Sequence, residues 1–152
     1  MINVQIVAIG KIKEKYFVDA INEYAKRLSK FCKFSVVELP EKSEQTNINK
    51  KIEEESRLLE TACKGTIILL DRLGKNTSSE ELAAIIKKTE LFSSTISFVI
   101  GGSNGVSQAL KQKADYVVSF GAITFPHQLF RVVLSEQIYR AFAINAKMPY
   151  HK

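Results

Sequence analysis

The sequence has no apolar run that approaches the roughly 20 residues a membrane-spanning helix requires. Its first residues also lack the basic start and the cleavage pattern of a secretory signal peptide. We therefore expect a protein that stays in the cytoplasm. With 152 residues, of which 45% are hydrophobic, the chain can build one core of ordinary size, which predicts a single domain over residues 1–152.

Cysteine and histidine are scarce, with two residues of each. Cys32 and Cys63 stand far apart and form no CxxC pattern, and His127 and His151 complete no recognisable metal-ligand spacing. We expect two free thiols in a reducing compartment and no metal site.

Two familiar nucleotide-binding sequences are absent. No Gly-Lys-Ser or Gly-Lys-Thr follows a glycine-rich turn, which excludes a P-loop. The glycine-rich run 101–105, Gly-Gly-Ser-Asn-Gly, lacks the GxGxxG spacing, and residues 120–125 offer no acid, which disfavours a nicotinamide-dependent oxidoreductase. Glycines at the exit of a buried strand let backbone approach a ligand, yet the same run is consistent with a tight strand-to-helix turn and nothing more.

Strands and helices alternate along the chain. Apolar runs predict strands at 2–9, 33–39, 66–70, 95–100 and 116–120. Helical spacing and a cap at Ser78-Ser79-Glu80-Glu81 predict helices at about 14–30, 48–62, 79–90, 106–113 and 127–145, with a polar connection over 41–49. This order indicates an α/β fold with a mainly parallel sheet sandwiched by helices, in which ligands bind beyond the carboxyl ends of the strands.

Charge is unevenly distributed. The net charge of +6 is by itself a weak indication of a polyanionic partner, but the basic excess and both histidines fall in the last third of the chain. In the helix 48–62, the mixed charges of Lys50-Lys51 and Glu53-Glu54-Glu55 predict a solvated face with local pairing. The final helix is apolar around most of its circumference, and a second copy packing against it is one way to bury it, which makes a homodimer a reasonable hypothesis.

The last helix and the tail contain the remaining candidates. Glu136 and Arg140 are four residues apart in the order that favours an ion pair. Alternatively, Arg131 or Arg140, held by Glu136, reaches an RNA phosphate or base. The end 149–152, Pro-Tyr-His-Lys, has the position of a frayed tail, but it combines a ring that can stack on a base, a side chain that titrates near neutrality and a cation for phosphate.

Several of these segments together resemble the ribosomal RNA large subunit methyltransferase H family of the SPOUT, or α/β-knot, superfamily. The resemblance covers the whole chain, and its most specific part is the closing block from Arg131 to Phe142 and on to Lys152. The other matching segments are Val7-Ala-Ile-Gly-Lys11, Leu69-Leu-Asp71 with Gly74-Lys75, Phe98-Val-Ile-Gly-Gly-Ser-Asn-Gly105 and Thr124-Phe-Pro-His-Gln128.

The resemblance implies a deep trefoil knot near the C-terminus and S-adenosylmethionine bound in a bent form by the knot loops. It also implies a homodimer that acts on 23S ribosomal RNA in the assembled large subunit or ribosome and methylates N3 of a pseudouridine. The implied cofactor contacts are Leu70, Gly101, Phe120, Gly121, Ala122, Ile123, Thr124 and Phe125.

For the chemistry, the resemblance points to the tail. We expect His151 to ease removal of the imide proton, Tyr150 to pack against the target base, and Lys152 and Arg140 to hold phosphate or a developing oxyanion. The rival hypothesis is a non-catalytic ribosome-binding or assembly factor with the same fold, which would not bind S-adenosylmethionine.

Overall fold

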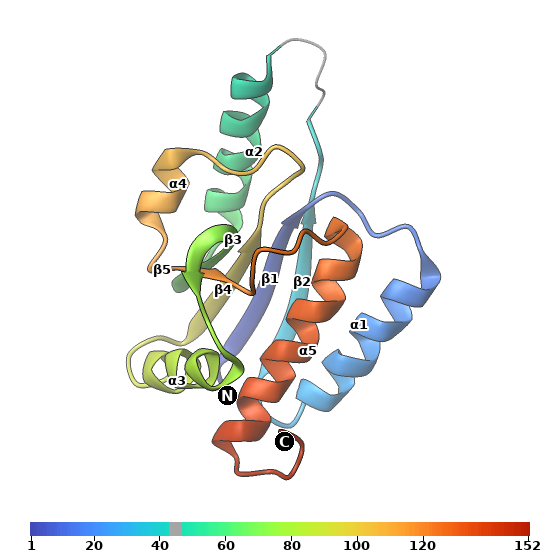
Figure 1. Cartoon of the computed structure of the whole chain (residues 1–152), viewed down its shortest axis with the longest axis vertical. Coiled ribbons are helices and arrows are strands. Elements are labelled where there is room, and N and C mark those ends of the chain that lie inside the picture. The colour runs from blue at the N-terminus through green and yellow to red at the C-terminus, as the bar shows by residue number, and fades with distance from the viewer. Residues whose placement is uncertain (43–46) are drawn as a thin grey trace.

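The computed structural model describes residues 1–42 and 47–152, so part of the expected polar connection 41–49 lies outside the described residues. Five parallel strands form one sheet in the order β2-β1-β4-β3-β5 (Figure 1). The strands are β1 (Asn3–Ile9), β2 (Lys33–Leu39), β3 (Thr66–Asn76), β4 (Thr95–Ile100) and β5 (Tyr116–Ser119). The helices are α1 (Lys15–Leu28), α2 (Ile48–Ala62), α3 (Ser79–Thr89), α4 (Gln108–Lys113) and α5 (His127–Asn145). The predicted α/β architecture and the order of its elements are confirmed.

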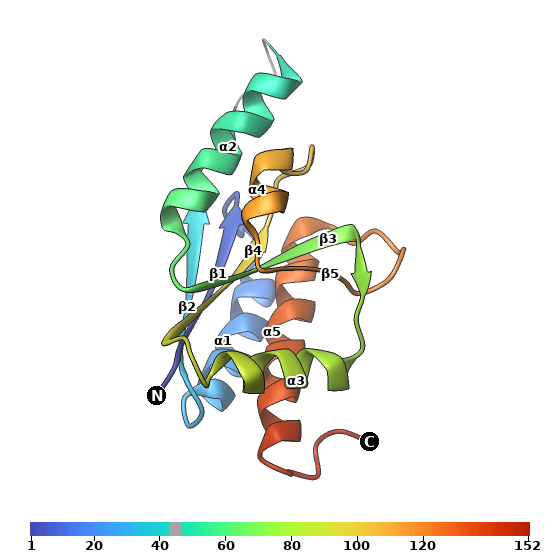
Figure 2. The same ribbon diagram turned by 90° about the vertical axis from the view of Figure 1, so that its left-hand side faces the viewer.

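Helices cover both faces of the sheet because side chains alternate along each strand. Val4 and Ile6 of β1 face a core shared with α1, α3 and α5, whereas Val7 and Ile9 face a smaller core with α2 and α4. The two layers are visible on opposite sides of the sheet in Figure 2. The strands β1, β4 and the first half of β3 are buried on both faces, and such strands read as continuous apolar runs in the sequence.

The prediction from the sequence is confirmed for the start of α3, whereas α2 is more buried than expected. Ser78 accepts from the backbone of Glu81 while the Glu81 side chain accepts from the backbone of Ser78, so α3 begins with a capping box. The solvated face predicted for α2 is wrong in part, because Lys51 and Glu55 are 2% and 0% exposed. Their spacing places them on the side that packs against the loop after β4.

The last helix lies between α1 and α3 on one face of the sheet (Figure 1). Leu134, Ile138 and Phe142 are buried there together with Ala141 and Ala143. Neighbours within the chain therefore supply much of the burial that its apolar surface demands. Among the described residues, no helix combines the length and the apolar character needed to cross a membrane.

Candidate functional site

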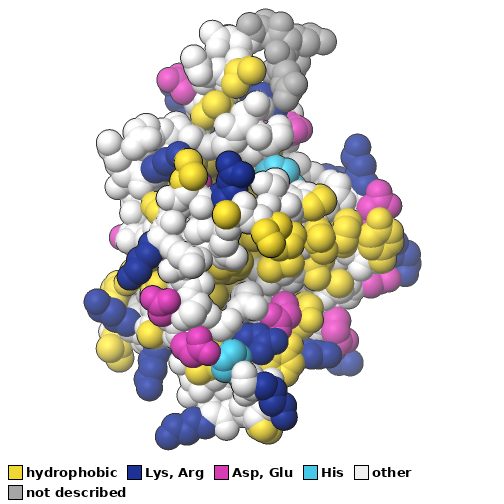
Figure 3. All heavy atoms as spheres, in the orientation of Figure 1, with side chains coloured by type: hydrophobic (Ala, Val, Ile, Leu, Met, Phe, Trp, Pro, Cys, Tyr) yellow, Lys and Arg dark blue, Asp and Glu magenta, His cyan; other side chains and the backbone are white. Residues whose placement is uncertain are grey.

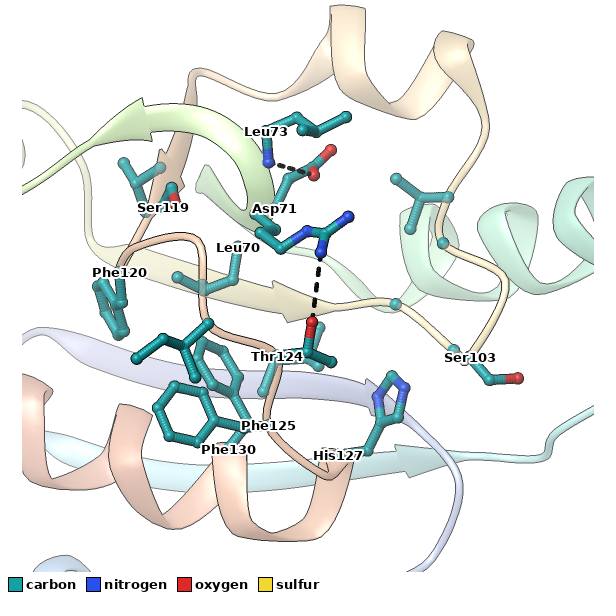
Figure 4. A pocket seen from close by; sticks show the side chains of 18 of the residues that line it. Leu70, Asp71, Leu73, Ser103, Ser119, Phe120, Thr124, Phe125, His127 and Phe130 are labelled. Atoms are coloured by element: carbon teal, nitrogen blue, oxygen red, sulfur yellow. Dashed lines mark hydrogen bonds between the residues drawn. The ribbon is translucent and has the colours of Figure 1, made fainter.

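A cavity of about 510 Å³ opens at the carboxyl ends of β3, β4 and β5, where three segments of the chain meet (Figure 4). The first segment follows the buried part of β3, the second is the glycine-rich run after β4, and the third joins β5 to α5. A parallel sheet brings these strand ends together, although the segments are up to 60 positions apart. The cavity is lined by Leu70–Leu73, Ile100–Val106, Lys111, Val118–Gly121, Ile123–Phe125, His127 and Phe130.

The first wall is a bulge in β3. Leu70 and Lys75 both pair with Val118, so residues 71–74 leave the ladder and pass over the cavity. Asp71 accepts from the backbone N–H of Leu73 at 3.0 Å and pairs with Lys111 of α4 at 3.2 Å. The strand predicted at 66–70 therefore extends to Asn76, but only after an interruption that the sequence pattern did not reveal.

The second wall is the glycine loop, residues 101–105, which α2 holds from behind. Lys51 Nζ donates to Asn104 Oδ1 over 2.8 Å, and Ser56 Oγ accepts from the backbone N–H of Ser107 over 2.8 Å. Between them lies the buried Glu55: a Cβ added to Gly102 would lie 2.7 Å from Glu55 Oε1. A side chain at position 102 would therefore require the carboxylate of Glu55 or the loop itself to shift.

The third wall is the connection from β5 to α5. Gly121 has a φ of +116°, a conformation that side chains disfavour, and Ser119 Oγ accepts its backbone N–H at 3.1 Å. The rings of Phe120 and Phe125 lie 5.7 and 5.9 Å from the ring of Phe130, centroid to centroid. This wall therefore combines aromatic rings with a glycine turn, and Arg72 of the first wall donates to Thr124 of the third over 3.3 Å (Figure 4).

Seven of the eight residues expected to contact a cofactor line this cavity, and Ala122 does not. The sequence did not point to Lys111, His127 or Phe130 as lining residues. His127 stands at the edge of the cavity near Ser103 (Figure 4). Its pKa is lowered, first by desolvation and second by the charge of Arg131, so its imidazole is neutral at neutral pH.

The four residues expected to carry the chemistry gather in a separate cluster at the far end of α5. Arg140 pairs with Glu136 at 2.8 Å, as the four-residue spacing predicted, and its guanidinium lies 4.7 Å from the ring centroid of Tyr150. The Tyr150 hydroxyl donates to Glu136 Oε2 over 2.6 Å. Burial and this hydrogen bond raise the pKa of Tyr150 to about 12, so the phenol is protonated at neutral pH.

His151 closes the cluster, while Lys152 is exposed beside it. His151 Nδ1 lies 3.1 Å from Arg140 Nη1, and Nε2 lies 2.5 Å from Glu80 Oε1. A guanidinium can only donate, so Nδ1 accepts and the ring carries its hydrogen on Nε2, which donates to Glu80. Both ring nitrogens are therefore engaged in hydrogen bonds in this arrangement.

The cavity and the tail cluster are apart within one chain. His127 borders the cavity and Arg140 lies 13 residues further along α5, which corresponds to about 20 Å of helix. No tail residue lines the cavity. The two histidines accordingly stand well apart on the face shown in Figure 3.

Arg131 does not take the role considered for it beside Glu136. It is 1% exposed, and its guanidinium donates to Glu38 Oε2 at 2.7 Å and to the carbonyls of Ile9 and Gly10 at 2.9 and 2.7 Å. It therefore ties the second turn of α5 to the carboxyl ends of β1 and β2. Within the described residues, no group of three or more His, Cys, Asp or Glu side chains is placed to hold a metal ion.

Comparison with known proteins identifies the family of the chain. A family described as predicted SPOUT methyltransferases matches residues 2–151. The chain belongs to the SPOUT methyltransferase family. The relatives include ribosomal RNA large subunit methyltransferase H from Clostridium botulinum, 47% identical over 99% of each chain. The protein of the same name from Lactiplantibacillus plantarum is 49% identical over 99% of each chain.

A solved structure shows the same fold. A probable methylase family protein from Haemophilus influenzae superposes with a TM-score of 0.60 at 13% identity, over 99% of this chain and 71% of that chain. The family match over residues 2–151 and the relatives of 47% and 49% identity confirm the predicted family and its methyltransferase class, whereas the deep trefoil knot stays a prediction. S-adenosylmethionine is the methyl donor that this family assignment supports.

The cavity fits such a cofactor. Its volume lies within the range of small-molecule sites, and its lining combines apolar and aromatic side chains with backbone groups, as an adenine ring requires. A Cβ added to Gly105 or Gly121 would meet nothing within 4 Å, so both glycines leave open space beside backbone that a ligand can approach.

Proposed function

We propose that this chain methylates N3 of a pseudouridine in 23S ribosomal RNA, using S-adenosylmethionine and acting in the cytoplasm on the assembled large subunit or ribosome. The proposal is supported by relatives that are named as methyltransferases of large-subunit ribosomal RNA and match 99% of the chain. The main observation behind the proposal is the cavity between the three loops. Seven of the residues that line it are residues that the family resemblance implies as contacts of the cofactor.

The active form proposed is a homodimer in which the tail of one copy completes the cavity of the other. The support is the distance of about 20 Å along α5 between cavity and tail, which leaves each cavity without a proton acceptor from its own tail. Leu73 and Ile123, 81% and 75% exposed at the rim of the cavity, offer apolar surface for such a contact.

When bound, S-adenosylmethionine supplies an electrophilic methyl carbon beside its sulfonium. The chain must hold the target base in line with that carbon and ease loss of the proton from the imide nitrogen, which is a poor nucleophile until then. In this proposal His151 accepts the proton, Tyr150 packs on the base, and Arg140 and Lys152 stabilise negative charge. Because both ring nitrogens of His151 are engaged, docking must first separate it from Glu80 or Arg140.

Mass spectrometry of large-subunit RNA tests the reaction and the substrate together. RNA from a strain that lacks this gene should have lost one methyl group on one pseudouridine, and the wild-type gene should restore it. Unchanged RNA would contradict the proposal. Calorimetry with S-adenosylmethionine separates the enzyme from a ribosome-binding factor, since the factor would give no heat of binding.

A mixing experiment tests the composite site. His151→Ala removes the expected base, and Thr124→Trp fills the cavity at an exposed position. Each variant alone should be inactive, whereas a mixture should recover about a quarter of wild-type activity, because half the dimers then contain one intact site. A mixture that stays inactive although both variants exchange subunits would refute the composite site. Near-normal single-turnover methylation by His151→Ala would show that His151 is not the base.

A further inference from the structure

A second cavity of about 590 Å³ adjoins the first, at the carboxyl ends of β1 and β2. The two cavities share Gly102, Ser103 and His127 as lining residues. None of the eight residues expected to contact the cofactor lines the second cavity. Its lining also includes Lys11, Lys13, Arg131, Gln128 and the acids Glu38 and Glu41.

The two acids are already neutralised by cations of the protein. Glu38 accepts from Arg131, and Glu41 lies 4.0 Å from Lys51 Nζ. Lys11 and Lys13, by contrast, are exposed, and the structure places no carboxylate of residues 1–42 or 47–152 in an ion pair with either. Counted over the described lining residues, the charge left over is therefore positive.

The loop that carries the two lysines is held in place. Gly10 has a φ of +92° and donates to the carbonyl of Leu39 over 2.7 Å. The buried Ile12 donates from its backbone to Glu38 Oε2 over 2.8 Å, and the backbone N–H of Lys13 donates to the side chain of Gln128 over 3.3 Å. Because Ile12 points inward, the lysines on either side of it are presented at the cavity.

The first turn of α5 contributes further donors. Pro126 precedes the helix and provides no side-chain cap, so the first backbone N–H groups of this 19-residue helix have no side-chain acceptor among the described residues. Arg131 lines the same cavity from the next turn; it is 1% exposed, and its Nε has no hydrogen-bond partner. Uncapped amides at the positive end of the helix dipole favour an anion.

We propose that this second cavity binds a phosphate group of the RNA substrate, with Lys11, Lys13 and the first turn of α5 as its donors. The choice of RNA as the ligand of this site rests on the proposed function. An RNA that is methylated at the first cavity must place its backbone close to the second cavity. A phosphate held here places the adjoining nucleoside beside the wall, Gly102 and Ser103, that both cavities share. Phosphate contacts of this kind set register and orientation rather than sequence preference.

The test compares Lys11→Ala/Lys13→Ala with a matched control, Lys87→Ala/Lys88→Ala, which removes two exposed lysines from α3. In the first variant the KM for ribosomal substrate should rise about tenfold, and the slope of log affinity against log salt should fall by about one. The turnover number and the dissociation constant for S-adenosylmethionine should stay within about twofold. The control should match the wild type in all four quantities.

Inorganic phosphate probes the site without RNA. In amide-detected NMR, phosphate should shift the signals of Lys11 and of residues 127–129 in the wild type and the control, but not in the double variant. Shifts that persist in the double variant, or that are absent from the wild type, would overturn the phosphate site. Weaker binding of S-adenosylmethionine with an unchanged KM for RNA would assign the anion to the cofactor carboxylate and equally overturn it. Because the phosphate titration needs no methylation, it distinguishes failure of this site from failure of the proposed function.

Discussion

Lys51 donates from Nζ to Oδ1 of Asn104 over 2.8 Å, so a buried lysine of α2 holds the loop that forms one wall of the cofactor cavity. One turn further along α2, Glu55 lies beneath Gly102 of the same loop. The position of the glycine loop therefore depends on a helix that itself does not line the cavity.

Gly102→Ala should weaken binding of S-adenosylmethionine by about tenfold or more, because the new Cβ would lie 2.7 Å from Glu55 Oε1 and overpacking displaces backbone. Calorimetry measures the affinity. Adding Glu55→Ala should restore part of it by making room, whereas Gln108→Ala at an exposed position of α4 should have no effect. Wild-type affinity in Gly102→Ala would show that the loop does not need this packing.

Glu38→Ala should lower the free energy of unfolding by about 3 kcal/mol, because it leaves the guanidinium of Arg131 buried without its carboxylate. Chemical denaturation measures the loss. Replacing both residues, in Arg131→Met/Glu38→Leu, should recover a large part of it, since no charge is then left unpaired. A double variant no more stable than Glu38→Ala would contradict this account of the pair.

Deprotonation of Tyr150 should lower the free energy of unfolding between about pH 10 and pH 12. Its pKa is raised from the model-compound value of 10.0 to about 12, first by burial and then by its hydrogen bond to Glu136. The folded state therefore holds the proton more tightly than the unfolded state, and this contribution is complete below pH 10 and disappears as the pH passes 12. Melting temperatures of the wild type should drop more steeply over this interval than those of Tyr150→Phe. Tyr16→Phe, at a 65% exposed position, is the matched control and should follow the wild type.

Neither cysteine should react with iodoacetamide in the folded protein at pH 8. Burial raises the pKa of Cys32 to about 12 and that of Cys63 to about 11, so the reactive thiolate is rare. Mass spectrometry should find the intact chain unmodified after an hour and doubly modified in denaturant. Rapid alkylation of the folded protein would mean that these segments open easily. The expectation of free thiols is confirmed, because both cysteines are unpaired.

The assembled ribosome should be a far better substrate than a short naked hairpin of the target sequence. A net charge of +6 and one small basic cavity provide few phosphate contacts, so binding to free RNA should be weak at physiological salt. Steady-state kinetics at matched RNA concentration compares the two substrates. Equal catalytic efficiency on the hairpin would refute the need for the folded particle.

Much of the fold could be predicted because its signals are local. The apolar run at 95–100 is β4, Ser78 and Glu81 form the cap of α3, and Glu136 pairs with Arg140 one turn away. Each of these depends on residues a few positions apart, where spacing along the chain translates directly into spacing along a strand or a helix.

The cofactor cavity was predictable through the family resemblance and not through spacing alone. The glycine run taken by itself was also consistent with a simple turn. The bulge at residues 71–74 could not be found this way, since it is defined by the register against β5, about 45 residues later. Ala122 was named with its neighbours, but it does not line the cavity.

The sequence by itself determined the order of strands and helices, the parallel sheet and the family, because these follow from hydrophobic periodicity and from short runs of neighbouring residues. Only the tertiary structure decided what charged residues do: it buried Lys51 and Glu55 behind the glycine loop and joined Arg131 to Glu38 across 93 positions. It also kept the tail about 20 Å along α5 from the cavity of its own chain. The physical reason is that the cost of burying a charge depends on the groups around it, and the packing of distant segments decides which groups those are.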